Sequence, residues 1–481
     1  MFFATVLAAI EGCDQENSLL KSVGVLSLEE NTLNLFHILT LLIFFLAIVH
    51  TLLTHKIRQY ADKVESKHRK RLKKKNLPNE ERGRERVSFF AECLFFLGEV
   101  EVVFAVWAIP LFALIAFFYN WTVALDYINT RDYSEALYVV VIMIIASTRP
   151  IVLFTEMILR VIANLFGSSV TAWWFVVMTI GPITGSVLTE PAAMVLCCML
   201  LSRKFYSYHP SVPLAYATLG LLFVNVSVGG VLTNFAAPPV VVVASCWELS
   251  SWYMFKTFGI IAIIGVLLCN FIYWHFFRSE FRKLNKIKEK NPIPKIEKKK
   301  VPLWITAIHC GILAWMIFHV HYPAVVIASL LLFLGFHRAT HHHQDEMYLK
   351  RPFLVGAFLA GLVIHGGVQG WWVTAILDRL HALSLMIVGV ILSAFIENAA
   401  VTYLTSLTPD LTSSFKYAII AAAVTGGGLT VIAHAANPVG QALLEKHFKQ
   451  GVAPLYLFLS ALLPTIIFFI LYYIPFILNG F

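Results

Sequence analysis

The sequence has little charge. Only 14% of its 481 residues are Asp, Glu, Lys or Arg, whereas about a quarter of the residues in a soluble domain are charged. Hydrophobic residues make up 58% of the chain, and the mean hydropathy is +0.75. A chain of this composition cannot bury its apolar surface as a water-soluble globule. We therefore predict an all-α polytopic membrane protein whose partner is the lipid bilayer.

The sequence also lacks the common catalytic motifs. It contains no G-x-S-x-G, no H-E-x-x-H and no phosphate-binding G-x-x-x-x-G-K-[ST]. We interpret the protein as not an enzyme, with ion gradients rather than ATP as its energy source, and keep a membrane-embedded enzyme as a remote alternative. The seven cysteines show no C-x-x-C spacing, so the sequence implies neither a disulfide framework nor a thiolate metal site. We expect no cofactor and no transition metal.

Basic residues gather in two hydrophilic stretches, residues 56–86 and 278–300. Without interleaved aromatic residues they do not predict nucleic-acid binding. Lys and Arg accumulate in cytoplasmic loops, so both stretches are predicted to be cytoplasmic loops. The first span, residues 35–53, then runs inward, and residues 1–34 are predicted to be an extracytoplasmic N-terminal segment. The C-terminus is predicted to be extracytoplasmic too.

Two polar stretches inside apolar sequence resemble each other, TEPAAM at 189–194 and IENAAV at 396–401. Each is followed by a stretch rich in Gly and Pro, at 229–240 and at 426–439. An ionised carboxylate at membrane depth costs several kcal/mol unless a cation, a proton or a partner compensates it. Gly and Pro interrupt a helix and free its carbonyl groups to hold a ligand. We interpret the four stretches as one site.

The candidate ion ligands of this site are hard oxygen donors, which a small alkali cation such as Na+ accepts. They are Thr189, Glu190, Thr233, Asn234, Glu397, Asn398, Thr430 and Asn437. Further residues allow the backbone to leave the helix. They are Gly229, Gly230, Pro238, Gly426, Gly427, Gly428 and Pro438.

Four other residues are candidates for proton coupling: His434, Glu92, Glu99 and Glu101. A histidine changes charge near neutral pH, although His434 could instead be a neutral side chain satisfied by backbone. The three glutamates fall in one expected span, residues 89–118, with Glu92 and Glu99 on one helix face. For them we favour packing against polar groups, or a water-lined cytoplasmic vestibule, over a proton path.

Each half of the chain is predicted to contain three spans, an interfacial helix, a re-entrant hairpin, a broken helix and a last span. The hairpin arms are expected to be too short or too interrupted to cross alone. Because the halves enter the membrane from opposite sides, the sequence predicts an inverted repeat. Repeat 1 covers residues 35–277, with a cytoplasm-facing hairpin at about 167–203 and the broken helix at about 212–245. Residues 278–300 are a basic cytoplasmic linker. Repeat 2 covers residues 301–481, with an outward-facing hairpin at about 383–407 and the broken helix at about 416–444.

These tips and breaks resemble the ion-transporter superfamily, which includes the D-type and B-type sodium/proton antiporters, the arsenite pumps and the divalent-anion/sodium symporters. The chain is most similar to bacterial sodium/proton antiporters. The resemblance implies an elevator-type transporter in the bacterial inner membrane, a homodimer in which a scaffold carries a mobile transport domain. Sodium would be held between the hairpin tips and the breaks.

The predicted function is therefore exchange of Na+ (or Li+) for H+ by a secondary transporter. The tips carry Glu190 and Glu397 where the anion symporters have a Ser-Asn-Thr pattern, and two carboxylates attract cations and repel a dianion. A sodium-coupled anion symporter or an arsenite-type exporter is the alternative, since bound sodium would neutralise the glutamates first.

Overall fold

The computed structural model describes residues 30–74, 88–290, 301–319, 322–347, 349–377, 380–408, 410–448 and 451–478. Most of the expected N-terminal segment 1–34, the second part of the linker 278–300 and the C-terminal residue therefore lie outside the described residues. Every regular element within these ranges is a helix, in agreement with the predicted all-α membrane protein.

The chain divides into two compact units. The smaller unit contains α3 (Glu30–Lys74), α5 (Phe89–Leu97), α6 (Val103–Phe118), α7 (Trp121–Asn129) and most of α19 (Lys350–Gly366). The larger unit contains α8 (Ser134–Ala146), α9 (Arg149–Leu165), α10 (Val170–Leu188), α11 (Glu190–Lys204), α12 (Val212–Gly229), α13 (Pro238–Ala244), α14 (Ser251–Met254), α15 (Ile260–Phe276), α16 (Arg278–Lys290), α17 (Leu303–Phe318), α18 (Pro323–Ala339), α20 (Gly370–Leu377), α21 (Ala382–Phe395), α22 (Asn398–Ser406), α23 (Ser413–Gly426), α24 (Asn437–Leu444) and α25 (Pro454–Leu478).

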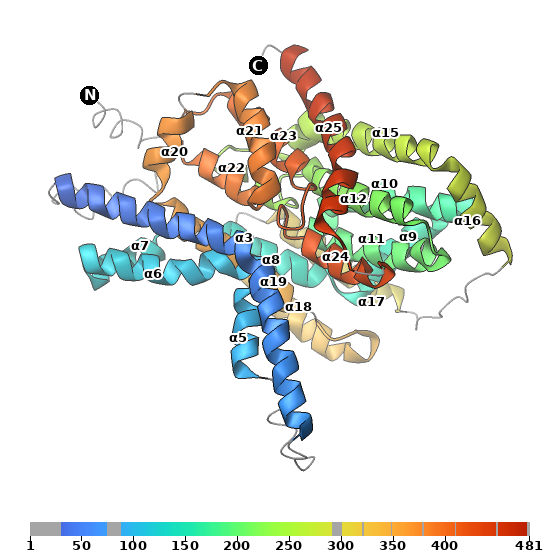
Figure 1. Ribbon diagram of the computed structural model, residues 1–481, viewed down its shortest axis with the longest axis horizontal. Helices are drawn as coiled ribbons and strands as arrows, with labels where there is room; N and C mark the ends of the chain where they lie inside the picture. The colour runs from blue at the N-terminus through green and yellow to red at the C-terminus, as the bar shows by residue number, and fades with distance from the viewer. Residues whose placement is uncertain are drawn as a thin grey trace. The chain divides into compact units, whose positions relative to one another are not determined.

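The smaller unit corrects two expectations. The first basic stretch is not a loop as far as the structure describes it, because α3 continues without interruption to Lys74 and lies beside α5 (Figure 1). Its Lys, Arg and Glu residues are good helix formers, and Arg69 pairs with Glu65 one turn earlier at 2.8 Å. The expected single span 89–118 is also wrong, since α5 ends at Leu97 and α6 starts at Val103. Glycine at position 98 favours an end to the helix there.

The second basic stretch also begins as a helix. Residues 278–290 form α16, which buries Phe281 and Leu284 and contacts α10. The Asn285 amide accepts from the backbone of Thr171 at 3.2 Å and donates to its hydroxyl at 3.0 Å. These contacts explain why a sequence read as a solvated loop is helical: one of its faces has a partner.

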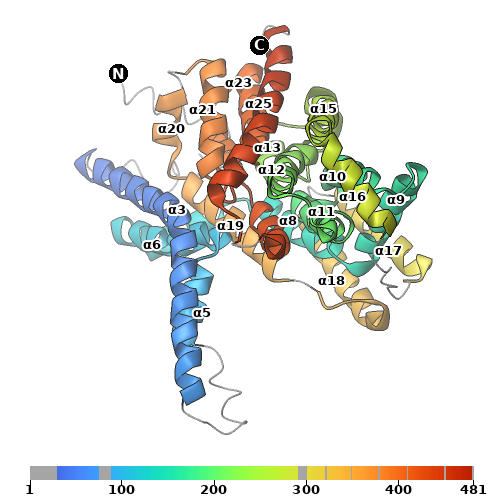
Figure 2. The same cartoon turned by 45° about the vertical axis from the view of Figure 1, so that its right-hand side comes forward.

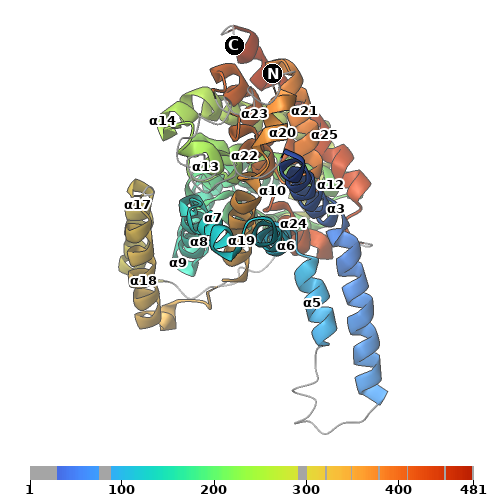
Figure 3. The ribbon, with the colours of Figure 1, turned by 90° about the vertical axis from the view of Figure 1, so that its left-hand side faces the viewer.

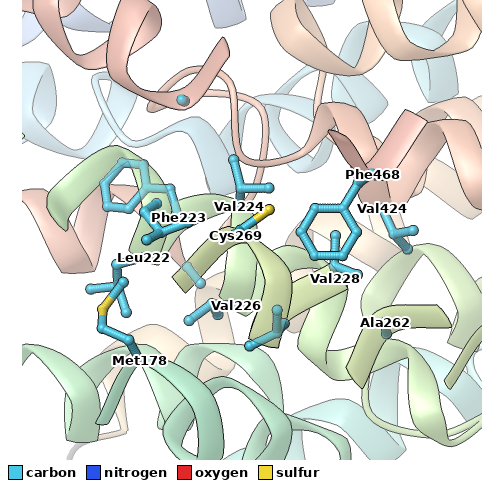
Figure 4. Close-up of a cluster of buried hydrophobic side chains, with 14 of the residues drawn as sticks. Met178, Leu222, Phe223, Val224, Val226, Val228, Ala262, Cys269, Val424 and Phe468 are labelled. Carbon is cyan, nitrogen blue, oxygen red and sulfur yellow. The ribbon is translucent and has the colours of Figure 1, made fainter. Parts of the chain in front are cut away.

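Helix α12 forms the centre of the larger unit. All 18 residues from Leu214 to Val231 are buried. Helices α10, α11, α15, α23 and α25 contact α12. A helix that is apolar all round belongs in the interior of a protein rather than at its surface. Val224 and Val228 of α12 lie near Val424 of α23 and Phe468 of α25 in the apolar cluster around it (Figure 4). This packing holds in place the ends of the helices that form the polar site.

Two helical hairpins flank this core. In the first, α10 packs along α11 and the turn is the single residue Thr189. In the second, α21 and α22 are joined through Ile396 and Glu397. Helix α21 also packs along α23, which contacts α25 (Figure 2). One expectation about the hairpins is wrong: α10 has 19 residues and is long and apolar enough to cross a membrane.

Two helices break in the ranges read from sequence. Helix α12 ends at Gly229 and α13 starts at Pro238, while α23 ends at Gly426 and α24 starts at Asn437. Each hairpin contacts the broken helix of the other half of the chain. Helix α11 packs against α24, and α22 packs against α13. The second arm of each hairpin therefore contacts the helix that follows the break in the other half of the chain.

Within the described residues, six helices are long and apolar enough to cross a membrane, or seven if the pair from Ala136 to Leu165, bent by 67°, is one span. Helices α17 and α18 are shorter and apolar, and they pack side by side (Figure 3). The multi-pass membrane character read from composition is supported by these helices.

The structure contains a disulfide, although the cysteine spacing implied no disulfide framework. Cys246, in the turn after α13, is disulfide-bonded, whereas Cys197, Cys198 and Cys269 are buried free thiols. A cysteine inside an apolar helix behaves as a small hydrophobic side chain. The position of Cys246 outside a helix, rather than any spacing motif, distinguishes it.

The contact between the two broken helices leads to a stability prediction. A Cβ on Gly428 would overlap the backbone N and Cα of Val224 in α12. We expect Gly428→Ala to destabilise the protein by about 1–3 kcal/mol, because backbone cannot move aside as a flexible side chain can. Gly311→Ala in α17 is the matched control, since no atom lies within 4 Å of a Cβ there. Thermal unfolding in detergent would measure both; equal unfolding temperatures would contradict the close approach.

Candidate functional site

The first hairpin tip places Glu190 at the first position of α11. Thr189 before it has φ 77°, a conformation that a β-branched residue adopts only under constraint. Its hydroxyl makes no capping hydrogen bond to α11. Glu190 is 0% exposed, and a Cβ on Gly230 of the first break would overlap its carboxyl group. Glycine at 230 therefore allows the break to lie directly against this carboxylate.

Glu190 has a partner that the sequence did not reveal. Its Oε2 contacts Nε2 of His434, from the second break, and both side chains are completely buried. The other ring nitrogen of His434, Nδ1, accepts a hydrogen bond from the Ala436 amide at 3.2 Å. His434 is thus satisfied at both nitrogens, once by a carboxylate of the other half of the chain and once by backbone.

The second tip presents its carboxylate differently. Glu397 is the N-cap of α22, and its Oε2 accepts from the Ala399 amide at 2.8 Å. It is 3% exposed. His434 and Glu190 are ionisable groups that interact electrostatically with Glu397. The two glutamates and the histidine therefore form one buried electrostatic cluster, in which two acids face a single base.

Hydrogen bonds from hydroxyl and amide groups connect each hairpin tip to the break in the same half of the chain. In the first half, Ser186 donates to the Gly229 carbonyl at 2.7 Å, and Thr233 donates to the Ser186 carbonyl at 2.7 Å. In the second, Thr430 donates to the Ala394 carbonyl. The Asn398 backbone amide also donates to the Ala433 carbonyl at 3.0 Å. The tips are therefore held against the breaks by hydrogen bonds through irregular backbone.

The Asn437 side chain stabilises the irregular backbone of the second break by hydrogen bonds. Its amide nitrogen donates to the carbonyls of Gly427 and Thr430, both at 2.8 Å. Proline follows at 438, in the first turn of α24, where a missing N–H costs nothing. Pro238 occupies the corresponding start of α13.

Several buried oxygens of the site have no hydrogen-bond partner. They are Oγ1 of Thr189, Oε1 of Glu190, Oδ1 of Asn398 and Oδ1 of Asn437. Buried polar atoms are normally satisfied, so unpartnered hard oxygens from two hairpin tips and one break suit a small cation. Four of the eight ligands read from sequence contribute such an atom.

The other candidate ligands are engaged differently. The hydroxyl groups of Thr233 and Thr430 donate hydrogen bonds to backbone carbonyls of the hairpins. Asn234 lies in the first break but bonds to the chain that follows α13. Its amide nitrogen donates to the Leu249 carbonyl at 2.6 Å, and its amide oxygen accepts from the Ser251 hydroxyl at 2.6 Å. Both the nitrogen and the oxygen of the Asn234 side chain therefore already have hydrogen-bond partners.

Glu92, Glu99 and Glu101 lie in the smaller unit. Glu92 and Glu99 do not share a helix face, because α5 ends between them. Glu99 is 3.7 Å from Arg58 of α3, and Glu101 is 4% exposed in the turn before α6. The ion pair of Glu99 is of the kind expected for packing against polar groups.

Sequence reasoning missed three serines. Ser186 and Ser393 each lie four residues before a tip glutamate, and Ser227 ties the two broken helices together by donating to the Val424 carbonyl at 2.7 Å. The matched spacing of Ser186 and Ser393 was a signal in the sequence, which aligning the two hairpins from their glutamates would have shown. Ser227 follows no such pattern.

The geometry can be set beside known proteins. Residues 35–475 match the protein family described as "Putative Na+/H+ antiporter". The matched range includes both hairpin tips, both breaks and nearly every helix from α3 to α25. No curated protein matches the chain.

Proposed function

The chain belongs to this family, and we propose that it exchanges Na+ (or Li+) for H+ as a secondary active transporter. The observation that carries the proposal is the buried cluster of Glu190, His434 and Glu397, together with unpartnered oxygens of the same tips and break. Isolated carboxylates at this depth are costly. Sodium or protons can neutralise them, and either ion then makes the site fit to cross the membrane.

The charge balance of the site favours a cation as the substrate. The tip and break sequences contain two glutamates and one histidine but no Lys or Arg. A carboxylate or arsenite substrate would meet like charge there, whereas anion sites usually present Arg or Lys. Sodium and protons both reduce the negative charge. They should therefore compete for one site, and competition is what exchange requires.

The crosswise packing supports an inverted-repeat, elevator-type transporter. Helix α11 against α24 and helix α22 against α13 are the same contact made once by each half of the chain. Two repeats of opposite orientation would create such a pair of contacts around a central site. We propose that the hairpins and broken helices form the mobile transport domain, and that the protein works as a homodimer in the bacterial inner membrane.

The distribution of charge sets the proposed orientation. The basic extension of α3 and helix α16 would face the cytoplasm. The disulfide-bonded Cys246 follows α13, on the side that this orientation places outside. Disulfides persist in oxidising compartments, so the covalent chemistry of this turn agrees with the charge rule.

Cysteine labelling tests the orientation. In intact cells, a membrane-impermeant maleimide should label Thr412→Cys from outside but should label Lys290→Cys only after permeabilisation. Both positions are exposed side chains, so accessibility within the protein does not distinguish them. The parent protein corrects for its native thiols. Labelling at position 290 in intact cells would overturn the orientation and the proposed direction of both hairpins.

Purified protein in liposomes tests the function. With an imposed pH gradient and no ATP, adding Na+ or Li+ should dissipate the gradient, whereas K+ should not. Dicarboxylate and arsenite form separate arms of the experiment. If the gradient survives sodium alone but collapses when sodium and an anion are added together, the anion symporter is the correct function.

A further inference from the structure

The two ring nitrogens of His434 face groups of different kind. Nε2 meets the Glu190 carboxylate, and Nδ1 lies 3.2 Å from the backbone nitrogen of Ala436. A backbone amide can only donate, so Nδ1 must accept and carries no hydrogen. The hydrogen of a neutral imidazole then sits on Nε2, where it is donated to Glu190.

We infer that His434 is a positioning residue that serves as a neutral hydrogen-bond donor: it holds Oε2 of Glu190 and leaves Oε1 free for the transported ion. Oε1 has no partner in the structure. This inference rests on the proposed function, because it assigns a part within the same site. It also chooses between the two interpretations of His434 that the sequence left open.

The backbone around His434 fixes the ring in this position. The Ala433 carbonyl accepts from the Asn398 amide at the second tip, and the His434 carbonyl accepts from the Asn437 amide, both at 3.0 Å. Ala433 thus contacts the second tip through its carbonyl, while the His434 ring contacts Glu190 of the first tip. Counted back from the helix that follows each break, the first break has Phe235 at the place of His434, and a phenyl ring cannot donate to the opposite tip.

An imidazolium that carries the exchanged proton is the competing possibility. It would place an N–H at Nδ1 directly against the Ala436 N–H, and a buried donor left without an acceptor is costly. The charged groups that act on His434 are Glu190 on α11 and Glu397 at the start of α22. Either of these two carboxylates can accept the exchanged proton, so His434 itself does not have to carry it.

Two substitutions separate these possibilities in the liposome assay. The amide of Gln can reach the place of Nε2 and donate there without titrating, whereas the shorter Asn cannot reach Glu190. We expect His434→Gln to keep sodium-dependent exchange, with an apparent KM for sodium within about fivefold of the parent and the same pH profile. We expect His434→Asn to raise that KM by at least about tenfold, because Glu190 loses a charge-assisted hydrogen bond.

Either of two results would overturn the inference. A displaced or flattened pH profile in His434→Gln would show that the imidazole titrates during exchange. A parental KM in His434→Asn would show that Glu190 needs no donor. Detergent gel filtration and thermal unfolding of both variants establish that they are folded.

A spectroscopic measurement keeps the inference testable even if a variant fails to fold. The 15N spectrum of histidine-labelled parent protein, recorded at a pH where exchange is active, should contain a neutral ring with hydrogen on Nε2 whose shifts respond to sodium. An imidazolium signal in its place would contradict the inference. Failure of the proposed function is a different result, in which the parent shows no sodium-dependent pH change while the spectrum still reports the tautomer.

Discussion

Replacing either Glu190 or Glu397 with Gln should abolish sodium/proton exchange while leaving the protein folded and inserted in the membrane. Both side chains are buried, at 0% and 3% exposure, so an amide of the same size preserves the packing. It removes the negative charge that binds the cation and the oxygen that accepts the proton. We expect the initial rate in liposomes to fall on the order of 100-fold, which corresponds to about 2.8 kcal/mol.

The two variants should differ in stability. Glu190→Gln keeps an acceptor for His434, and removing a buried charge removes its desolvation cost. Glu397→Gln exchanges the carboxylate that caps α22 for a weaker cap. We therefore expect Glu397→Gln to unfold at a slightly lower temperature than Glu190→Gln, with both variants remaining monodisperse in detergent.

Glu92→Gln is the matched control, because it makes the same chemical change at an exposed residue of α5 in the smaller unit. It should exchange sodium at the parental rate. Full exchange in both Glu190→Gln and Glu397→Gln would show that the tip carboxylates are structural. The search for the coupling groups would then move to Glu99 and Glu101.

The sequence predicted the places where the helices stop, because the causes are local. Gly229 and Gly426 end α12 and α23, and prolines lie in the first turn of α13 and α24. A missing Cβ or a missing N–H acts at its own position in the chain. The hairpin tips follow from the same reasoning, since a polar residue between two apolar runs marks a turn.

The basic stretches were mispredicted because hydrophilicity indicates contact with solvent but does not indicate a loop. The described part of each stretch is helical. In α16, two apolar side chains are buried and Asn285 bonds to Thr171 of α10. Whether a charged segment folds as a helix depends on such tertiary contacts as well as on propensity.

The pairing of Glu190 with His434 could not be read from the sequence. The two residues are 244 positions apart, and their contact depends on α11 packing against α24. Hydropathy placed each residue at membrane depth but gave no distance between them. The same limit explains Asn234, whose amide is bonded by a loop that returns to it fifteen residues later.

Sodium affinity should weaken as the pH falls. The site has two buried carboxylates but a single base, so it can hold negative charge that sodium or protons neutralise. Protons compete more strongly at low pH and occupy the carboxylates that would otherwise bind the cation. If one proton leaves for each sodium that binds, apparent affinity should fall by about tenfold for each pH unit across the titration range of the pair.

Calorimetry of sodium binding between about pH 6 and pH 9 measures this linkage. Titrations in two buffers of different ionisation enthalpy give the number of protons released for each sodium bound. Glu190→Gln and Glu397→Gln should each weaken sodium binding and reduce its pH dependence, because one of the two competing carboxylates is gone. Glu92→Gln should retain the parental dependence.

If sodium binds equally well across this range and releases no protons, competition at these glutamates is wrong. A symporter with permanently ionised carboxylates would then explain the site better, because sodium would serve to admit a second substrate.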